Sequence, residues 1–147
     1  MKVDFLRHAQ SIFNANLTSE KDCDLTELGK QQASAVEGEY DLVFCSVMKR
    51  AQQTLAYSKI KRGKVIYTLH CREKRVDICD FLPDEDETKK ESDEELEQRI
   101  TAFLSFLKSN VSPYQTVLVV SHGDFIHALG KKTKPYPTNA EIQSFDV

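Results

Sequence analysis

Residues 3–11 read VDFLRHAQS, and this stretch decides how the rest of the chain is interpreted. Its largely apolar first half predicts a short buried strand that ends at Arg7 and His8. Residues 117–123, VLVVSHG, repeat the arrangement, because a second apolar run ends near His122. In parallel α/β folds, ligands bind beyond the carboxyl ends of the strands. Both histidines therefore stand where such a fold would bind its ligand.

Apolar runs elsewhere extend this pattern into an alternation of strands and helices. Further strands are expected at 42–45, 65–69 and 142–147. Helices are expected from a cap at Thr26 to about Val36, around Met48, Ala51 and Leu55, from the Ser92/Glu95 capping box to about Ser109, and over 123–130. Glu37-Gly38 should end the first helix, and the basic residues 59–64 should form a turn. The alternation predicts an α/β fold, a three-layer α/β/α sandwich with a mostly parallel central sheet.

Length and composition narrow the class of protein. The 147 residues fit one domain spanning positions 1–147. A hydrophobic content of 40% and a net charge of -3 are typical of a globular protein, and they favour neither a nucleic-acid nor a membrane partner. The N-terminus lacks the apolar stretch of a signal peptide, so a cytoplasmic location is expected. The sequence does not decide the oligomeric state.

The four cysteines form no C-x-x-C pair. We expect Cys23, Cys45, Cys71 and Cys79 to be free thiols in a reducing compartment. A metal cluster built from His70 and its neighbouring cysteines would match no common zinc spacing and would lack a fourth ligand. We therefore expect neither a metal ion nor a cofactor.

The side chains at the predicted strand ends suit a phosphoryl group. Two imidazoles, His8 and His122, would meet two guanidiniums, Arg7 and Arg50, at one edge of the sheet. A guanidinium offers a fork of donors that matches phosphate oxygens, and a neutral imidazole can act as the nucleophile. A helix N-terminus after His122 would add backbone N–H donors. A lone histidine or arginine is more often structural or solvated, so the hypothesis depends on their joint placement.

Seven sequence blocks then point to a family. They are Arg7-His8-Ala9-Gln10-Ser11 with Asn14, Leu25-Thr26-x-x-Gly29-x-x-Gln32-Ala33, Ser46-x-x-x-Arg50-Ala51-x-Gln53-Thr54, Arg72-Glu73, Glu91-Ser92 with Leu96 and Arg99-Ile100, Val119-Val120-Ser121-His122-Gly123, and Asn139-Ala140-Glu141-Ile142. In this order the blocks resemble the histidine phosphatase (phosphoglycerate mutase-like) superfamily. Each block alone is unspecific, but the ordered series covers nearly the whole chain.

The resemblance implies a role for each matching residue. His8 would be the phosphorylated nucleophile, with His122 as its catalytic partner. The phosphoryl group would be bound by Arg7, Asn14, Arg50, His122 and Gly123. Glu73 would protonate the leaving oxygen and then activate water, and a partly buried carboxyl in this position should have a raised pKa. A glutamate in such a charged stretch is otherwise simply exposed. Alternative carboxyls for the role are Asp77, Asp80 and Asp124.

Two departures from the family pattern bear on activity. Ala9 replaces the usual glycine, and its methyl group could crowd the phosphate loop. About twenty residues separate Glu73 from the helix at Leu96, too few for the long insertions that cover a mutase pocket, so we expect an open site that favours hydrolysis. The favoured activity is a metal-independent phosphomonoesterase acting on a phosphorylated small molecule or phosphoprotein. A phosphoglycerate mutase and an inactive phospho-ligand-binding module remain alternatives.

Overall fold

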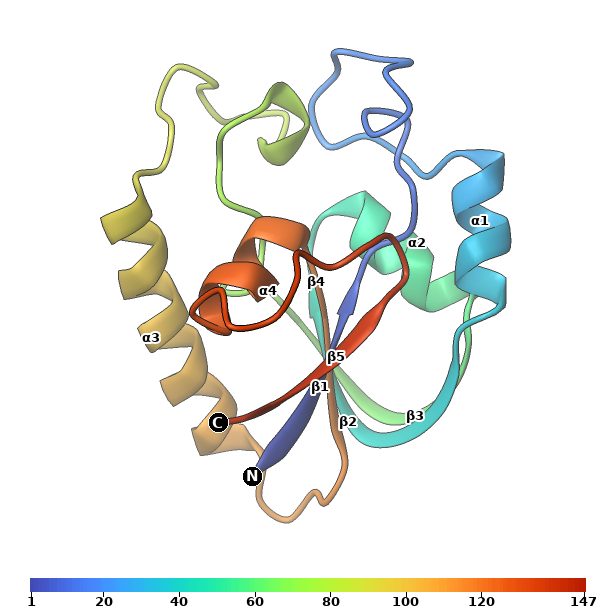
Figure 1. Ribbon diagram of the computed structural model, residues 1–147, viewed down its shortest axis with the longest axis vertical. Helices are drawn as coiled ribbons and strands as arrows, with labels where there is room; N and C mark the ends of the chain where they lie inside the picture. The colour runs from blue at the N-terminus through green and yellow to red at the C-terminus, as the bar shows by residue number, and fades with distance from the viewer.

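The computed structural model describes all 147 residues, and one five-stranded sheet forms its centre (Figure 1). The strands are β1 (Lys2–Arg7), β2 (Glu37–Ser46), β3 (Lys59–Thr68), β4 (Val117–Ser121) and β5 (Ile142–Asp146). They lie in the order β3-β2-β4-β1-β5, with β1 to β4 parallel and β5 antiparallel to β1. The mostly parallel sheet expected from the sequence is confirmed.

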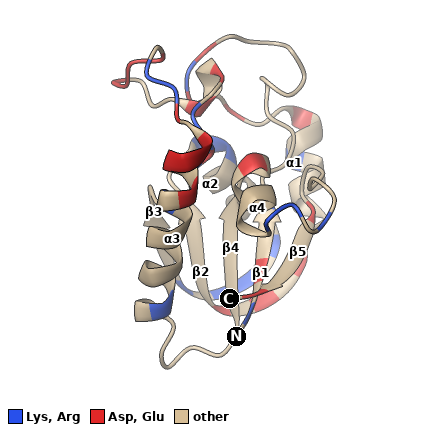
Figure 2. Ribbon diagram, turned by 60° about the vertical axis from the view of Figure 1, so that its left-hand side comes forward, with Lys and Arg blue, Asp and Glu red and all other residues tan.

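Helices cover both faces of the sheet, which completes the three predicted layers. α1 (Glu27–Ser34) and α2 (Lys49–Tyr57) lie on one face, and α3 (Asp93–Asn110) and α4 (Gly123–Leu129) lie on the other (Figures 1 and 2). In β4, Val117 and Val119 pack in the same core as α3 and α4, whereas Leu118 and Val120 pack in the core that contains α2. A strand buried on both faces needs a continuous apolar run, which is the pattern seen. None of the helices has the length and apolar character needed to span a membrane.

The helix starts follow the caps expected from the sequence. The Thr26 side chain accepts a hydrogen bond of 2.9 Å from the backbone N–H of Gly29, and Ser92 and Glu95 form a reciprocal capping box at the start of α3. The first turn of α3 also carries three acidic residues, seen as a red band in Figure 2, which oppose the positive end of the helix dipole.

The strands β2 and β3 are longer than their apolar segments predict. The turn expected at residues 59–64 is wrong, because these residues form the first half of β3; Glu37-Gly38 likewise opens β2 rather than ending α1. The two polar halves pair in parallel register, with Glu37 opposite Lys59, so charges of opposite sign lie side by side. Lysines also suit β3 because it is an edge strand. Pairing between strands, rather than an apolar pattern, makes these residues extended.

Two irregular segments stand over the carboxyl edge of the sheet, at the top of Figure 1. The first cover loop, residues 9–25, follows β1 and is closed at its base by a bridge between Ser11 and Leu25. The second cover loop, residues 69–92, follows β3 and contains a single 3-10 turn, η1 (Ile78–Asp80). The side chain of Lys21 joins the two loops through an ion pair of 3.0 Å with Glu87. The candidate site lies between these loops and the sheet.

Candidate active site

His8 follows β1 directly and is almost completely buried at the carboxyl edge of the sheet. Its Nδ1 lies 2.7 Å from the carbonyl oxygen of Ala9, and its Nε2 lies 3.3 Å from Nε of Arg50. A carbonyl oxygen can only accept and a guanidinium N–H can only donate, so both contacts require the same tautomer. The proton is then on Nδ1 and the lone pair on Nε2. Burial, followed by the charge of Arg50, holds the pKa of His8 well below its ordinary value, which keeps the ring neutral.

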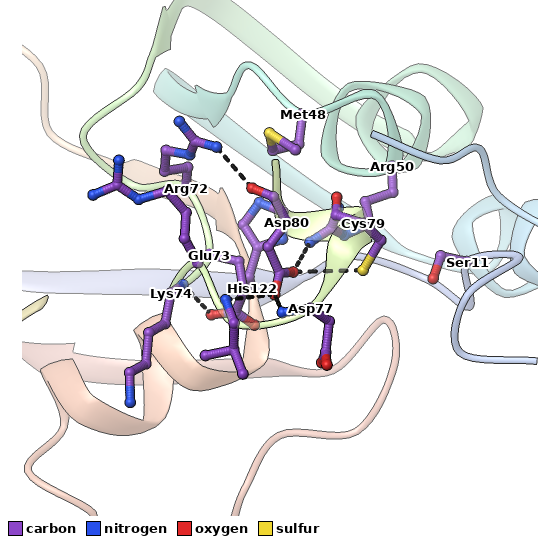
Figure 3. A network of polar contacts seen from close by, with 12 residues as sticks. Ser11, Met48, Arg50, Arg72, Glu73, Lys74, Asp77, Cys79, Asp80 and His122 are labelled. Carbon is purple, nitrogen blue, oxygen red and sulfur yellow. Dashed lines mark hydrogen bonds and ion pairs between the residues drawn. The ribbon is translucent and has the colours of Figure 1, made fainter. Parts of the chain in front are cut away.

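Arg50 lies in the first turn of α2 and is buried. Each of its three guanidinium nitrogens faces an acceptor from the protein. Besides the contact with His8, Nη1 donates to the carbonyl oxygen of Cys79 at 2.8 Å, and Nη2 donates to the carboxylate of Asp80 at 2.9 Å (Figure 3). A buried guanidinium requires such partners because its desolvation is costly. Arg50 therefore joins the nucleophile candidate to the second cover loop.

One cavity of about 100 Å³ brings together most of the residues predicted to form the site. It is bordered by Arg7, His8, Asn14, Arg50 and Glu73, together with residues of both cover loops. The Arg7 side chain comes from the end of β1, and its Nη1 donates to the carbonyl oxygen of Pro137 at 2.8 Å. The Asn14 side-chain oxygen accepts from the backbone N–H of Ser11 at 3.0 Å. The tertiary structure thus places two guanidiniums, an imidazole, an amide and a carboxyl around one small space.

Glu73 is buried and lies at the start of the second cover loop, with its carboxyl held by three backbone donors. It accepts hydrogen bonds from the N–H groups of Lys74, Asp124 and Phe125 at 2.9–3.1 Å. These donors favour the ionised form, but burial, followed by the negative charges of Asp124 and Asp80, has the larger effect and raises the pKa of Glu73 to about 7. A raised pKa was expected from the sequence, and the structure gives burial as its main cause.

The N-terminus of α4 differs from expectation. We predicted that its backbone N–H groups would be free for a phosphate, but those of Asp124 and Phe125 donate to Glu73. Gly123 does not border the cavity. Instead it packs against Tyr136, and a Cβ atom at Gly123 would come within 2.3 Å of the Tyr136 hydroxyl oxygen. The structure therefore requires glycine at position 123 because Tyr136 packs closely against it.

His122 lies behind the cavity, fully buried between β4 and α4. Its ring centroid is 5.1 Å from that of His8, so the two imidazoles predicted at the strand ends are neighbours. The Nε2 atom is 2.8 Å from the hydroxyl of Ser46 at the end of β2, and Nδ1 has no hydrogen-bond partner. Burial, followed by the charge of Arg50, holds the pKa of His122 well below its ordinary value. Ser46 thus orients a second neutral imidazole beside the first.

Ala9 does not crowd the site. Its backbone is not in the left-handed region, and its methyl group packs with Leu25 and Ala33 in a small apolar cluster away from the cavity. The Ala9 N–H donates to the hydroxyl of Thr54 at 2.9 Å. The crowding considered from the sequence is therefore not found, because this position does not need a glycine conformation and the methyl group points away from the cavity. Ala9 was the one departure in the sequence that favoured an inactive binding module, and the structure shows no crowding of the site by its methyl group.

The wall of the cavity opposite the sheet was not expected. Asp77, Cys79 and Asp80 line it from η1 and its N-cap, so the short second cover loop folds back over the site that we expected to be open. The sequence named Asp80 only as a reserve carboxyl, and its ion pair with Arg50 was missed. The only feature of the sequence that pointed to this ion pair was an aspartate a few residues after Glu73. Contact between residues thirty positions apart depends on how the loop turns, which periodicity does not encode.

A second, larger hollow is separate from the candidate site. It has a volume of about 740 Å³ and lies between α3, the end of α4 and the residues after it, with Leu96, Ile100 and Leu104 on its apolar side, and it contains none of the residues described above. No three His, Cys, Asp or Glu side chains converge in a way that could hold a metal ion. Metal-independent chemistry stays a prediction.

Fold and site together define an α/β protein with paired imidazoles and guanidiniums at the carboxyl edge of a parallel sheet. Residues 3–75 match the histidine phosphatase superfamily (branch 1). The chain belongs to this superfamily, as its ordered sequence blocks indicated. It is also similar to a protein of Hydrogenobacter thermophilus that is provisionally named phosphoserine phosphatase 2. The two are 29% identical over 152 residues, which cover 84% of this chain and 74% of the relative.

Solved structures share the fold over almost the whole chain. The α-ribazole phosphatase of Shigella flexneri has a TM-score of 0.74 and 19% identity, covering 100% of this chain and 91% of its own. The phosphoserine phosphatase of Entamoeba histolytica, in complex with 3-phosphoglyceric acid, has a TM-score of 0.72 and 22% identity, covering 99% of this chain and 90% of its own. At these identities the comparison establishes the fold, and the site must be argued from this chain's own residues.

Proposed function

We propose that the protein is a phosphomonoester hydrolase that works through a phosphohistidine on Nε2 of His8. The observation that carries this proposal is the state of His8: a neutral imidazole with its proton fixed on Nδ1 by the Ala9 carbonyl, in the same cavity as Glu73. The fixed tautomer directs the lone pair of Nε2 toward the guanidinium-lined side of the cavity, where an anionic phosphoryl group would bind.

The first half-reaction transfers the phosphoryl group to His8. Nε2 attacks phosphorus, the bond from phosphorus to the leaving oxygen breaks, and Glu73 gives its proton to that oxygen. The imidazolium that forms keeps its Nδ1 proton on the Ala9 carbonyl. A carboxyl with a pKa of about 7 suits this role, because a substantial fraction is protonated near neutral pH and the proton is still readily lost.

The second half-reaction returns the enzyme to its starting state. Water attacks the phosphorus of the phosphohistidine, the Glu73 carboxylate takes a proton from that water, and the phosphorus–nitrogen bond breaks. Inorganic phosphate leaves, and His8 is again neutral on Nε2. Arg7 and Arg50 would hold the phosphoryl oxygens in both halves, where charge neutralisation and positioning supply most of the catalysis. These two guanidiniums make a metal ion unnecessary in the proposed mechanism.

The substrate class is a phosphorylated small molecule or phosphoprotein. The names of the relatives, phosphoserine phosphatase and α-ribazole phosphatase, support a phosphomonoester whose leaving group is an alcohol. We place the activity in the cytoplasm, which is supported by four buried free thiols of the kind kept reduced there.

The decisive experiment is to trap the phosphoenzyme. Purified protein is mixed with a nitrophenyl phosphate in the presence of excess chelator, quenched in base within milliseconds, digested and mapped by mass spectrometry. We expect a phosphate on His8 that is stable in base and lost in acid. A His70→Gln variant is the matched control, because His70 stacks on Phe106 and does not line the cavity. Phosphate on another residue, or activity that requires added magnesium or zinc, would contradict the proposal.

A further inference from the structure

The two arginines of the candidate site are held in different ways. Arg50 forms a buried ion pair with Asp80, and all of its guanidinium nitrogens face protein acceptors. Arg7 forms no ion pair, and its Nη1 donates to an uncharged acceptor, the carbonyl oxygen of Pro137. The Nε atom of Arg7 is buried without a hydrogen-bond partner. Arg7 therefore keeps an uncompensated charge and unused donors, which are what an entering phosphate needs.

An aromatic ring supports Arg7 where a carboxylate would otherwise be expected. The guanidinium carbon of Arg7 lies over the ring of Tyr136, 5.4 Å from its centroid. A ring face attracts a cation through its quadrupole and uses none of the guanidinium N–H groups. A carboxylate in the same place would compete with phosphate for those donors. Tyr136 also borders the cavity, so this contact lies within the candidate site.

The local structure fixes the Tyr136 ring in this position. Tyr136 lies between Pro135 and Pro137 in the segment that joins α4 to β5 (Figure 1), and the two prolines restrict the backbone around it. Its hydroxyl donates a hydrogen bond of 2.8 Å to the carboxylate of Asp124 in the first turn of α4, and its ring packs against Gly123. The ring is therefore held under Arg7 before any ligand binds.

We propose that Tyr136 is a positioning residue that holds Arg7 as an unpaired cation, so that the phosphoryl group of a substrate binds to Arg7 first. This role rests on the proposed function, because it concerns the phosphoryl group bound at the same site. Arg50 would contact the phosphoryl oxygens second, after the Asp80 carboxylate has moved aside. The order follows because binding to Arg7 displaces no anion, whereas binding to Arg50 must compete with one.

The test measures the binding of inorganic phosphate by isothermal calorimetry, so it needs no turnover. Tyr136→Leu removes the ring face and should weaken phosphate binding by about tenfold. Tyr136→Phe keeps the ring under Arg7 and loses only the hydrogen bond to Asp124, so its affinity should stay within about threefold of the wild type. Wild-type affinity in Tyr136→Leu, or an equal loss in both variants, would overturn the proposed role.

Tyr57→Leu is the matched control. The two tyrosines are exposed to a similar degree, 47% for Tyr57 and 44% for Tyr136. Tyr57 also contacts a cation, because Nζ of Lys30 lies 5.5 Å from its ring centroid, but it does not border the cavity. Tyr57→Leu should therefore leave phosphate affinity unchanged. A loss as large as that in Tyr136→Leu would assign the effect to general destabilisation and contradict the role of Tyr136.

A double-mutant cycle separates an effect on Arg7 from a general effect on the segment after α4. In an Arg7→Gln background the cation is absent, so adding Tyr136→Leu should change phosphate affinity by less than about twofold. The phosphate concentration is raised in this background to suit the weaker binding, and thermal melting checks that each variant is folded. A tenfold loss in both backgrounds would show that Tyr136 does not act through Arg7, which would refute the proposal.

The same variants distinguish failure of this role from failure of the proposed function. If His8 is not phosphorylated but Tyr136→Leu still weakens phosphate binding, the catalytic mechanism fails and the role of Tyr136 stands. If His8 is phosphorylated, kcat/KM for a nitrophenyl phosphate should fall about tenfold in Tyr136→Leu and much less in Tyr136→Phe. Phosphorylation of His8 with an unchanged kcat/KM in Tyr136→Leu would leave the proposed function intact and refute the role of Tyr136.

Discussion

The two walls of the cavity are built in different ways. One wall consists of side chains at the ends of regular elements: Arg7 and His8 at the end of β1, and Arg50 in the first turn of α2. The other wall is the irregular second cover loop, which places Asp80 and Cys79 on Arg50. The regular wall is held by the buried sheet, whereas the irregular wall is held mainly by polar contacts. We infer that the regular wall carries the chemistry and that the irregular wall controls access to it.

The largest effect is expected from the regular wall. His8→Ala should reduce kcat/KM for any phosphomonoester by about 10⁴-fold or more, because the covalent nucleophile is lost. The variant should keep its fold, since the ring makes only two polar contacts. Steady-state kinetics together with circular dichroism measure both quantities. A folded His8→Ala protein with substantial activity would contradict the inference that the regular wall carries the chemistry.

A substitution at Glu73 tests whether this carboxyl acts as the general acid. Glu73→Gln should reduce kcat/KM for an alkyl phosphate by about 10²- to 10⁴-fold, and for a nitrophenyl phosphate by much less, because only the alkoxide needs a proton as it leaves. The acid must be protonated to act, so the wild-type kcat/KM for the alkyl substrate should fall as the pH rises above about 7. The pH–rate profile of the variant should lack this fall. Equal losses on both substrates would mean that Glu73 only orders the cavity.

A substitution at Asp80 tests whether the irregular wall controls access to Arg50. Asp80→Asn removes the charge that competes for Arg50, so inorganic phosphate should bind about tenfold more tightly, which corresponds to about 1.4 kcal/mol. In the absence of phosphate the variant should be less stable, because Arg50 keeps a buried charge without its ionic partner. Isothermal calorimetry and thermal melting with and without phosphate measure these changes.

A matched control removes the same charge from the same wall. Asp77→Asn eliminates a carboxylate that lines the cavity but does not contact Arg50, and asparagine can still cap η1. Phosphate affinity that rises equally in both variants would assign the effect to general electrostatics rather than to competition for Arg50.

The smallest effect is expected where the second cover loop joins a regular helix. Ser92→Ala removes the cap of α3 and should lower the free energy of unfolding by about 1 kcal/mol. The rate should not change, because Ser92 is exposed and does not line the cavity. Urea denaturation and steady-state kinetics test this pair of expectations. A clear loss of rate would show that the start of α3 helps to position the irregular wall.

Sequence reasoning predicted those parts of the fold in which apolar residues occur in a recognisable pattern, either as a continuous run or at helical spacing. The runs that became β1 and β4, the apolar stripe of α3 and the caps at Thr26 and Ser92 were all read correctly, because burial of one face or both leaves a repeating pattern. The polar first half of β3 was misread as a turn, because its partner is another polar strand and only pairing keeps it extended. The start of β2 was misread for the same reason.

The sequence by itself determined which residues could bind and transfer a phosphoryl group, because a nucleophilic imidazole and guanidiniums after predicted strands must meet at one edge of a parallel sheet. Only the tertiary structure decided how they meet. The tautomer of His8 depends on its contacts with Ala9 and Arg50, and the raised pKa of Glu73 depends on its burial near Asp124. The fold of the second cover loop, which places the Cys79 carbonyl oxygen and the Asp80 carboxylate on Arg50, follows from long-range contacts that leave no periodic pattern in the sequence.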